Sequence, residues 1–208
     1  MSRNLLGSFI LFAIIFILTI PIQPYPGSVA VKAVPAVCLA LLCLLKVKGM
    51  RGRLLFLAFL LCASGDAALS LDSGRYFIAG LVLFLLAQLT FLTTFALDFG
   101  PRRGNVLLAA ILIVYAAVMG AILKPYLADM VIPVFVYLTV ITAMSVMAAL
   151  RAPANRRIVA GAVVFVVSDS ILAVNKFASP VPAADFFVMI TYYAALFLIA
   201  TGFVRERT

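Results

Sequence analysis

Long apolar runs alternate with short polar breaks along the whole chain. Each run approaches the roughly 20 residues that, at about 1.5 Å per residue, cross a hydrocarbon core about 30 Å thick. The breaks are rich in proline, glycine, aspartate and serine, which form turns. The pattern predicts eight membrane-spanning helices, at residues 5–20, 29–47, 54–71, 76–97, 105–123, 131–150, 157–177 and 184–204. We therefore expect an all-α, polytopic membrane protein in which residues 1–208 form one transmembrane domain.

Composition supports this fold class and excludes several functions. Of the 208 residues, 66% belong to the set AVILMFWYC and 11% are charged, whereas soluble domains carry roughly 45–50% and 25%. The chain has no histidine, which excludes histidine-ligated zinc and Ser-His or Cys-His nucleophile pairs. Its three cysteines lie inside apolar runs and are expected to be buried. No phosphate-binding or nucleic-acid motif occurs, so we expect no cofactor, no metal and no nucleic-acid partner.

The basic residues predict the orientation of the chain. Of 16 lysines and arginines, 12 fall on one side of the predicted bundle: Arg3, Lys46, Lys48, Arg51, Arg53, Arg102, Arg103, Arg151, Arg156, Arg157, Arg205 and Arg207. Cytoplasmic loops carry the excess of basic residues. Both termini are therefore expected in the cytoplasm, most simply of a bacterial inner membrane. Asp98, at the end of the fourth span, is expected to be solvated.

Charged residues inside the spans are costly and usually mark function. Asp66 in the third span and Asp169 in the seventh lie roughly 18–20 Å above the cytoplasmic edge, counting about 1.5 Å per residue. Tyr192 comes within a turn or two of that level, and Gln88 lies somewhat deeper. We expect one pocket in the non-cytoplasmic half of the membrane, lined by Lys32, Asp66, Asp169, Lys176 and Tyr192.

Other interpretations of these residues stay open. The two lysines can simply neutralise the two aspartates as structural ion pairs. Gln88 and Tyr192 can join helices by hydrogen bonds. The serines beside the aspartates are candidate nucleophiles, but we expect them to bond back to their own helix instead; they are Ser64, Ser168 and Ser170. Gly65, Gly80 and Gly161 are expected to permit close helix contacts. A proton-coupled transporter or channel also uses intramembrane carboxylates and lysines, although the sequence has no clear inverted repeat of the kind such proteins carry.

Several motifs together resemble one family. They are Lys32-x-x-Pro35, Ser64-Gly65-Asp66 followed by Gly80 and Phe84, the run GAVVFVVSDSILAVNKF from Gly161 to Phe177, then Pro180, Pro182 and Thr191-Tyr192-Tyr193-Ala194-Ala195. The chain resembles the YhhN-like lysoplasmalogenase family, eight-helix membrane hydrolases of ether lipid metabolism. The resemblance implies hydrolysis of the vinyl ether bond of lysoplasmalogens to a fatty aldehyde and glycerophospho-ethanolamine or -choline.

The expected chemistry suits the residues. Vinyl ether hydrolysis needs an acid, a stabiliser of positive charge and a positioned water, and two carboxyl groups can divide these tasks. We expect Asp66 and Asp169 to be catalytic, with a lysine holding the substrate phosphate as a point charge. The expected substrate-binding residues of this lysophospholipid site are Lys32, Gln88, Asn175, Lys176, Tyr192 and Tyr193.

Two positions differ from the family pattern. Gln88 stands where the family usually has histidine, and Leu196 where it usually has glutamine. Glutamine forms hydrogen bonds but does not carry a proton near neutral pH. A catalytically impaired protein that binds lysophospholipids is therefore the alternative to an active hydrolase.

Overall fold

The computed structural model describes residues 2–71, 75–99 and 105–206. Within these residues, eight helices are long and apolar enough to cross a membrane, which confirms the predicted spans. The helices are α1 (Ser2–Thr19), α2 (Ser28–Lys46), α3 (Gly49–Leu71), α4 (Phe77–Ala96), α5 (Val106–Leu123), α6 (Val131–Leu150), α7 (Arg156–Ala173) and α8 (Ala184–Arg205). Arg102, Arg103 and Arg207, which the sequence assigns to the basic side, lie outside the described residues.

Two helix boundaries differ from the sequence prediction by more than three residues. α3 begins at Gly49, five residues earlier than expected, because Gly49 adopts a left-handed φ of +72° that turns the chain directly out of α2. Arg51 and Arg53 therefore lie in the first turns of α3, where arginine is a good helix former. At the other end of the chain, α7 stops at Ala173 and the helix continues as a π-helix, Val174–Ala178.

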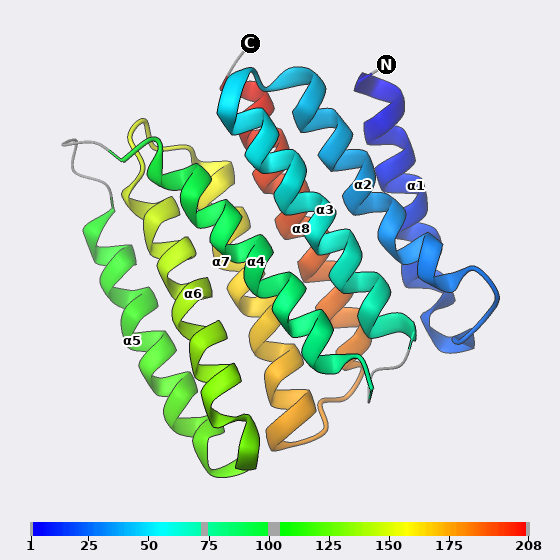
Figure 1. Cartoon of the computed structure of the whole chain (residues 1–208), viewed down its shortest axis with the longest axis vertical. Coiled ribbons are helices and arrows are strands. Elements are labelled where there is room, and N and C mark those ends of the chain that lie inside the picture. Colours follow the sequence, from blue (N-terminus) through cyan, green and yellow to red (C-terminus); the bar gives the residue numbers. More distant parts are fainter. Residues whose placement is uncertain (1, 72–74, 100–104, 207–208) are drawn as a thin grey trace. The chain divides into compact units, whose positions relative to one another are not determined.

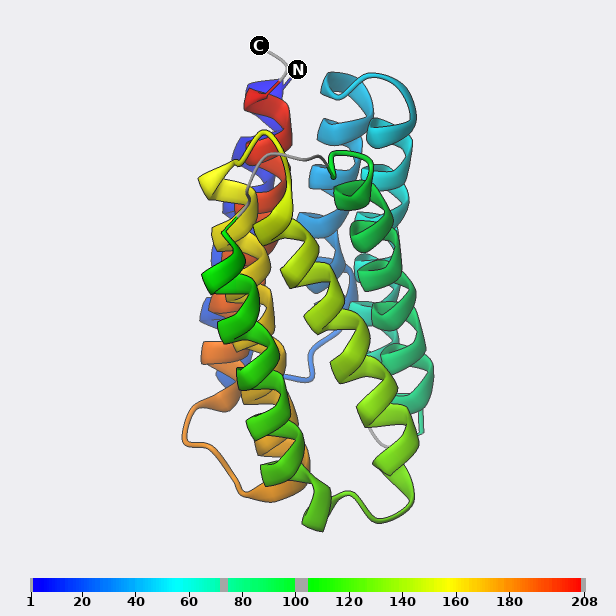
Figure 2. The same ribbon diagram turned by 90° about the vertical axis from the view of Figure 1, so that its left-hand side faces the viewer.

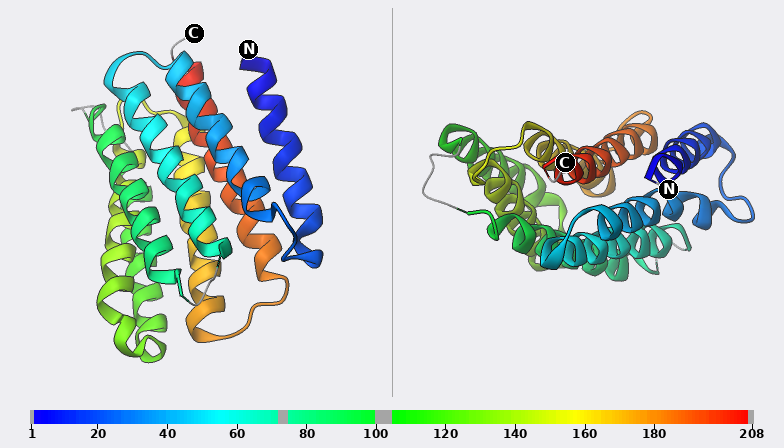
Figure 3. Two further views of the ribbon diagram at one scale, coloured as in Figure 1. Left: turned by 45° about the vertical axis from the view of Figure 1, so that its right-hand side comes forward. Right: turned by 90° about the horizontal axis from the view of Figure 1, so that it is seen from above.

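Contacts divide the helices into two compact units. Unit 1 comprises residues 1–91 and 200–208, and unit 2 comprises residues 92–199. In unit 1, α1 packs on α2 and α2 on α3; in unit 2, α5 packs on α6 and α6 on α7 (Figures 1 and 2). The start of α1 and the end of α8 lie at the same end of unit 1 (Figure 3), as an even number of spans requires. Neither the single domain nor the cytoplasmic location of the termini is tested by this division, and both stay predictions.

Glycines allow close helix contacts in each unit, as predicted. A Cβ atom on Gly65 of α3 would lie 2.7 Å from the Phe84 ring of α4 in unit 1. A Cβ atom on Gly161 of α7 would lie 2.9 Å from the carbonyl oxygen of Ala195 in α8, within unit 2. Both distances are shorter than van der Waals contact allows, so a larger residue at either position would require its neighbour to shift.

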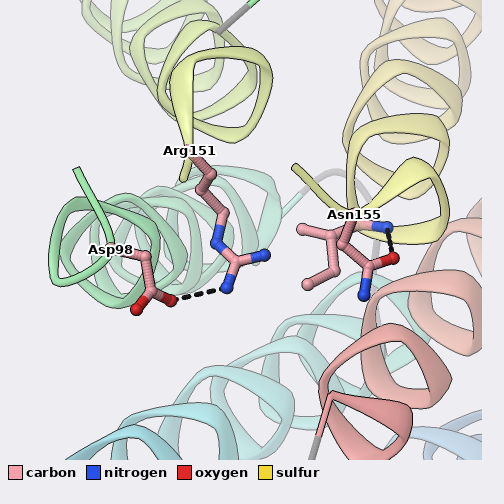
Figure 4. A network of polar contacts seen from close by, with 4 residues as sticks. Asp98, Arg151 and Asn155 are labelled. Atoms are coloured by element: carbon pink, nitrogen blue, oxygen red, sulfur yellow. Dashed lines mark hydrogen bonds and ion pairs between the residues drawn. The ribbon is translucent and has the colours of Figure 1, made fainter. Parts of the chain in front are cut away.

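An ion pair joins the ends of α4 and α6 in unit 2. Arg151 Nη2 donates to Asp98 Oδ2 across 2.5 Å (Figure 4), and the Ala152 amide donates to the Asp98 carbonyl at 2.9 Å. The Arg151 side chain is 1% exposed and that of Asp98 is 7% exposed. The expectation of a solvated Asp98 is therefore wrong, because a buried guanidinium needs a counter-ion. Nearby, Asn155 caps α7 by accepting from the Arg157 amide at 3.0 Å.

Candidate functional site

The polar residues singled out by the sequence fall into two groups, one in each unit. Unit 1 holds Lys32, Asp66 and Gln88, and unit 2 holds Asp169, Asn175, Lys176, Tyr192 and Tyr193. The structure describes each group within its own unit. The structure does not test the common pocket that we expected from the depth of these residues, so the pocket stays a prediction.

In unit 1, Lys32 lies beside Asp66. Lys32 stands in the second turn of α2, and its Nζ is 3.9 Å from Asp66 Oδ1 in α3. The same ammonium lies 5.9 Å from the centroid of the Phe16 ring in α1. Asp66 is 2% exposed. A nearby cation offsets part of the large cost of burying a carboxylate, so Lys32 is the counter-ion of Asp66.

Gln88 lies on the face of α4 that packs against α3. Phe84, one turn before it, contacts Gly65, and Phe91, one turn after it, meets the Phe59 ring edge-on at 5.3 Å between centroids. Gln88 is 0% exposed, and neither its Oε1 nor its Nε2 has a hydrogen-bond partner among the described residues. Leaving such an amide unpaired costs about 1–3 kcal/mol per group. A buried amide of this kind suits a ligand that both donates and accepts a hydrogen bond.

In unit 2, Asp169 is bonded to a residue that sequence reasoning missed. The hydroxyl of Tyr137 in α6 donates to Asp169 Oδ2 in α7 across 2.5 Å. Both side chains are half-buried. A single tyrosine in an apolar run is typical of a helix core, so its residue type gave no signal. Counting about 1.5 Å per residue along the sixth span, as was done for Asp66 and Asp169, would have placed Tyr137 near their depth.

The segment after α7 departs from the expected helix geometry. Lys176 follows Asp169 by seven positions, which is two turns of an α-helix. The segment is π-helical from Val174 onward, however, with i→i+5 hydrogen bonds. Lys176 is exposed. Asn175 Oδ1 accepts from the Val181 amide at 2.9 Å and so closes the turn that leads to α8. π-Helical turns are frequent at functional sites.

The tyrosines of α8 are packed into the interior of the protein. Tyr192 and Tyr193 are each 3% exposed. The Tyr192 ring meets Phe165 of α7 edge-on at 5.7 Å between centroids and lies 5.5 Å from the Tyr193 ring. Edge-to-face pairs of this kind stabilise by about 0.5–1.5 kcal/mol. The Tyr192 ring therefore joins α8 to α7, and Tyr193 packs beside it on α8.

The two serines beside Asp169 behave differently. Ser170 Oγ donates back to the Val166 carbonyl at 2.7 Å, as expected. Ser168 Oγ instead donates to the Val188 carbonyl of α8 at 3.0 Å. The expectation for Ser168 is wrong because its hydroxyl faces the neighbouring helix. The bond joins α8 to α7 directly before Asp169.

Each of the two groups contains one carboxyl group with a polar partner beside it. Asp66 has an ammonium beside it, and Asp169 has a phenol. Carboxyl groups so placed can give or take a proton and can stabilise a developing positive charge. Among the described residues, no group of three or more cysteines or carboxylates is arranged to hold a metal ion.

Comparison with known proteins gives consistent matches. A model of the YhhN family matches residues 27–203. The chain is 30% identical to the human lysoplasmalogenase TMEM86A over 92% of its length and 85% of the relative. It is 33% identical to human lysoplasmalogenase TMEM86B, covering 85% of the chain and 75% of the relative. It is 34% identical to a lysoplasmalogenase of Mycobacterium bovis, covering 86% of the chain and 70% of the relative. No solved structure gives a significant match.

Proposed function

The chain belongs to the YhhN family, and we propose on this basis that it is a lysoplasmalogenase. It is a multi-pass integral membrane protein whose proposed activity is hydrolysis of the vinyl ether bond of lysoplasmalogens. The observation that carries the proposal is the similarity to lysoplasmalogenases at 30–34% identity over most of the chain. We place it in a bacterial inner membrane, with glycerophospho-ethanolamine or -choline and a fatty aldehyde as products.

The reaction proceeds in three steps whose atoms balance. A proton adds to the alkene carbon remote from the ether oxygen, and the other alkene carbon becomes an oxocarbenium ion. Water adds to that carbon and loses a proton, which gives a hemiacetal. The hemiacetal hydroxyl then loses its proton to become the aldehyde carbonyl, while the glycerol oxygen leaves and takes up a proton. The enzyme must therefore supply one acid, one group that stabilises positive charge and accepts a proton, and one positioned water.

We assign the two catalytic roles to Asp66 and Asp169. Asp66 is buried beside Lys32, and the attraction of the ammonium favours a carboxylate there. A carboxylate stabilises an oxocarbenium ion and accepts the proton from water. Asp169, bonded to the neutral hydroxyl of Tyr137, supplies the proton to the alkene. Two carboxyl groups in different surroundings thus take different roles.

The substrate-binding roles follow from the surroundings of each residue. Lys176 is exposed in the π-helical segment, which suits an ammonium that meets the phosphate of the head group. Lys32 faces Asp66 instead, so it acts on the carboxylate more than on phosphate. The unpaired amide of Gln88 suits a water or a substrate hydroxyl. Asn175, Tyr192 and Tyr193 shape the surroundings of the bound lipid in this proposal.

The decisive experiment measures product directly. Purified protein is incubated with a lysoplasmalogen, and fatty aldehyde is quantified by mass spectrometry. The matched control is a lysophospholipid with a saturated ether at the same position, which cannot form an oxocarbenium ion by protonation. We expect aldehyde from the vinyl ether only. Binding of the lysoplasmalogen without aldehyde would favour the lipid-binding alternative, and proton flux in sealed vesicles without aldehyde would favour a transporter.

A further inference from the structure

We propose that Tyr137 is a positioning residue for the hydrolysis, acting through Asp169. The proposal rests on the proposed function and deepens it, because it adds a residue that no sequence motif indicated. The observation that carries it is the 2.5 Å hydrogen bond from the Tyr137 hydroxyl to Asp169 Oδ2. The bond joins α6 to α7 within unit 2.

In this proposal, the bond sets which oxygen of Asp169 carries the proton. A protonated carboxyl group has one O–H and one oxygen that accepts. Because the Tyr137 hydroxyl donates to Oδ2, the acid proton lies on Oδ1, and Oδ1 delivers it to the alkene carbon. After transfer, the negative charge on Asp169 is stabilised by the same phenol donor, since hydrogen bonds to charged groups are stronger than neutral ones. Tyr137 therefore favours proton release without taking part in the covalent steps.

The bond also fixes the direction of the carboxyl group. A terminal carboxyl torsion is broad and roughly two-fold, so an aspartate without a partner samples many orientations. The Tyr137 hydroxyl holds Oδ2 from the neighbouring helix. The bond therefore restricts rotation of the carboxyl group and fixes the direction in which Oδ1 points. Proton transfer to carbon requires close alignment of the donor with the alkene, and a misplacement of about 1 Å can reduce a rate a hundredfold. The loss should appear in kcat, because in this proposal Tyr137 acts on the proton donor and has no part in holding the lipid.

The test compares two identical substitutions in neighbouring helices. Tyr137→Phe removes the hydroxyl and keeps the ring, and Tyr115→Phe makes the same change in α5. We expect Tyr137→Phe to lower kcat by about ten- to a hundredfold, the scale of a hydrogen bond to a charged group, with KM changed less than about twofold. Tyr115→Phe should match the wild type. One limb of the pH–rate profile should be absent in Asp169→Asn and is thereby assigned to Asp169. In Tyr137→Phe, the midpoint of this limb should shift along the pH axis.

A coupling experiment separates this role from a structural one. If Tyr137 acts only through Asp169, the double variant Tyr137→Phe/Asp169→Asn should be no slower than Asp169→Asn alone. Multiplied losses, or a kcat and pH profile of Tyr137→Phe equal to those of the wild type, would overturn the proposal. Equal thermal unfolding of the variants excludes loss of folded protein as the cause.

A second measurement works even without turnover. Infrared difference spectra recorded across pH contain the carbonyl stretch of protonated Asp169, identified by its loss in Asp169→Asn. We expect this band to shift in Tyr137→Phe and to stay in place in Tyr115→Phe. If the wild type releases no aldehyde, the proposed hydrolysis fails while a shifted band still supports the Tyr137–Asp169 coupling. An unshifted band refutes the coupling whether or not the protein is active.

Discussion

The Lys32 ammonium lies 3.9 Å from Asp66 Oδ1, and the two residues come from adjacent helices of unit 1. Lys32 is therefore committed to a carboxylate in the structure, whereas the sequence alone allows it either that role or the binding of a substrate phosphate. The two roles predict different kinetics when Lys32 is replaced.

Replacing Lys32 by methionine should lower kcat by at least about tenfold, because it removes the counter-ion of a buried carboxylate. Lys32→Arg should keep part of the activity, since it retains the charge. Lys46→Met, on the exposed last turn of the same helix, is the control and should be near wild type. Steady-state kinetics with the lysoplasmalogen decides it: a raised KM with unchanged kcat would mean that Lys32 binds phosphate only.

The two aspartates should each be essential to turnover. Asp66→Asn and Asp169→Asn should each reduce aldehyde release at least about a hundredfold, the usual scale of a lost acid or base. Asp129→Asn and Asp185→Asn, at helix ends, should stay within about twofold of the wild type. Since residues that act as a unit lose activity non-additively, the double aspartate variant should be about as slow as the slower single one. Undiminished activity in both single variants would refute the mechanism.

Position 88 should respond to an ionisable side chain. Gln88→His should raise the rate and add a pH dependence near the imidazole range, about pH 6.5, because histidine carries protons and glutamine does not. Gln88→Leu is the matched control and should slow turnover, since it removes the buried amide. Aldehyde release measured between about pH 5 and 8 tests both. An identical rate for the glutamine, histidine and leucine proteins would place position 88 outside the reaction.

The contact between α7 and α8 should depend on glycine at position 161, which has no side chain. Gly161→Ala would put Cβ 2.8 Å from Ile199 Cγ1 and 2.9 Å from the Ala195 carbonyl oxygen. Overpacking of this kind costs about 1–3 kcal/mol, so unfolding in denaturant should occur earlier. At Gly7 of α1 a Cβ atom meets nothing within 4 Å, and Gly7→Ala should keep or slightly raise stability. Equal stability of the two variants would contradict the close packing.

The orientation of the chain should follow its charges. Eight spans and the 12 basic residues on one side predict both termini in the cytoplasm. A fluorescent reporter that folds only in the cytoplasm should be active when fused to the C-terminus and inactive after the Lys124–Tyr126 turn. A phosphatase that is active only outside should give the reverse pattern. The opposite result for both reporters would show that the charge rule fails for this chain.

Some features of the site were predictable because they depend on single residues. A carboxylate inside an apolar span is costly wherever the helix is rotated, so the sequence indicates Asp66 and Asp169 as candidate residues. The pairing of residues from different helices depends on helix rotation and separation. For that reason the phenol at Asp169 was missed, and Asp98 was expected in water when it lies against Arg151.

The sequence by itself determined the eight spans and the family motifs. In lipid each helix satisfies its own backbone hydrogen bonds, so the length and polarity of a segment are enough to predict that it spans. Only the tertiary structure decided that Tyr137 donates to Asp169, that Lys32 meets Asp66, and that the helix after α7 widens at Val174. These features arise from the packing of one helix on another and from the turns between them, which the polarity of a single segment does not encode.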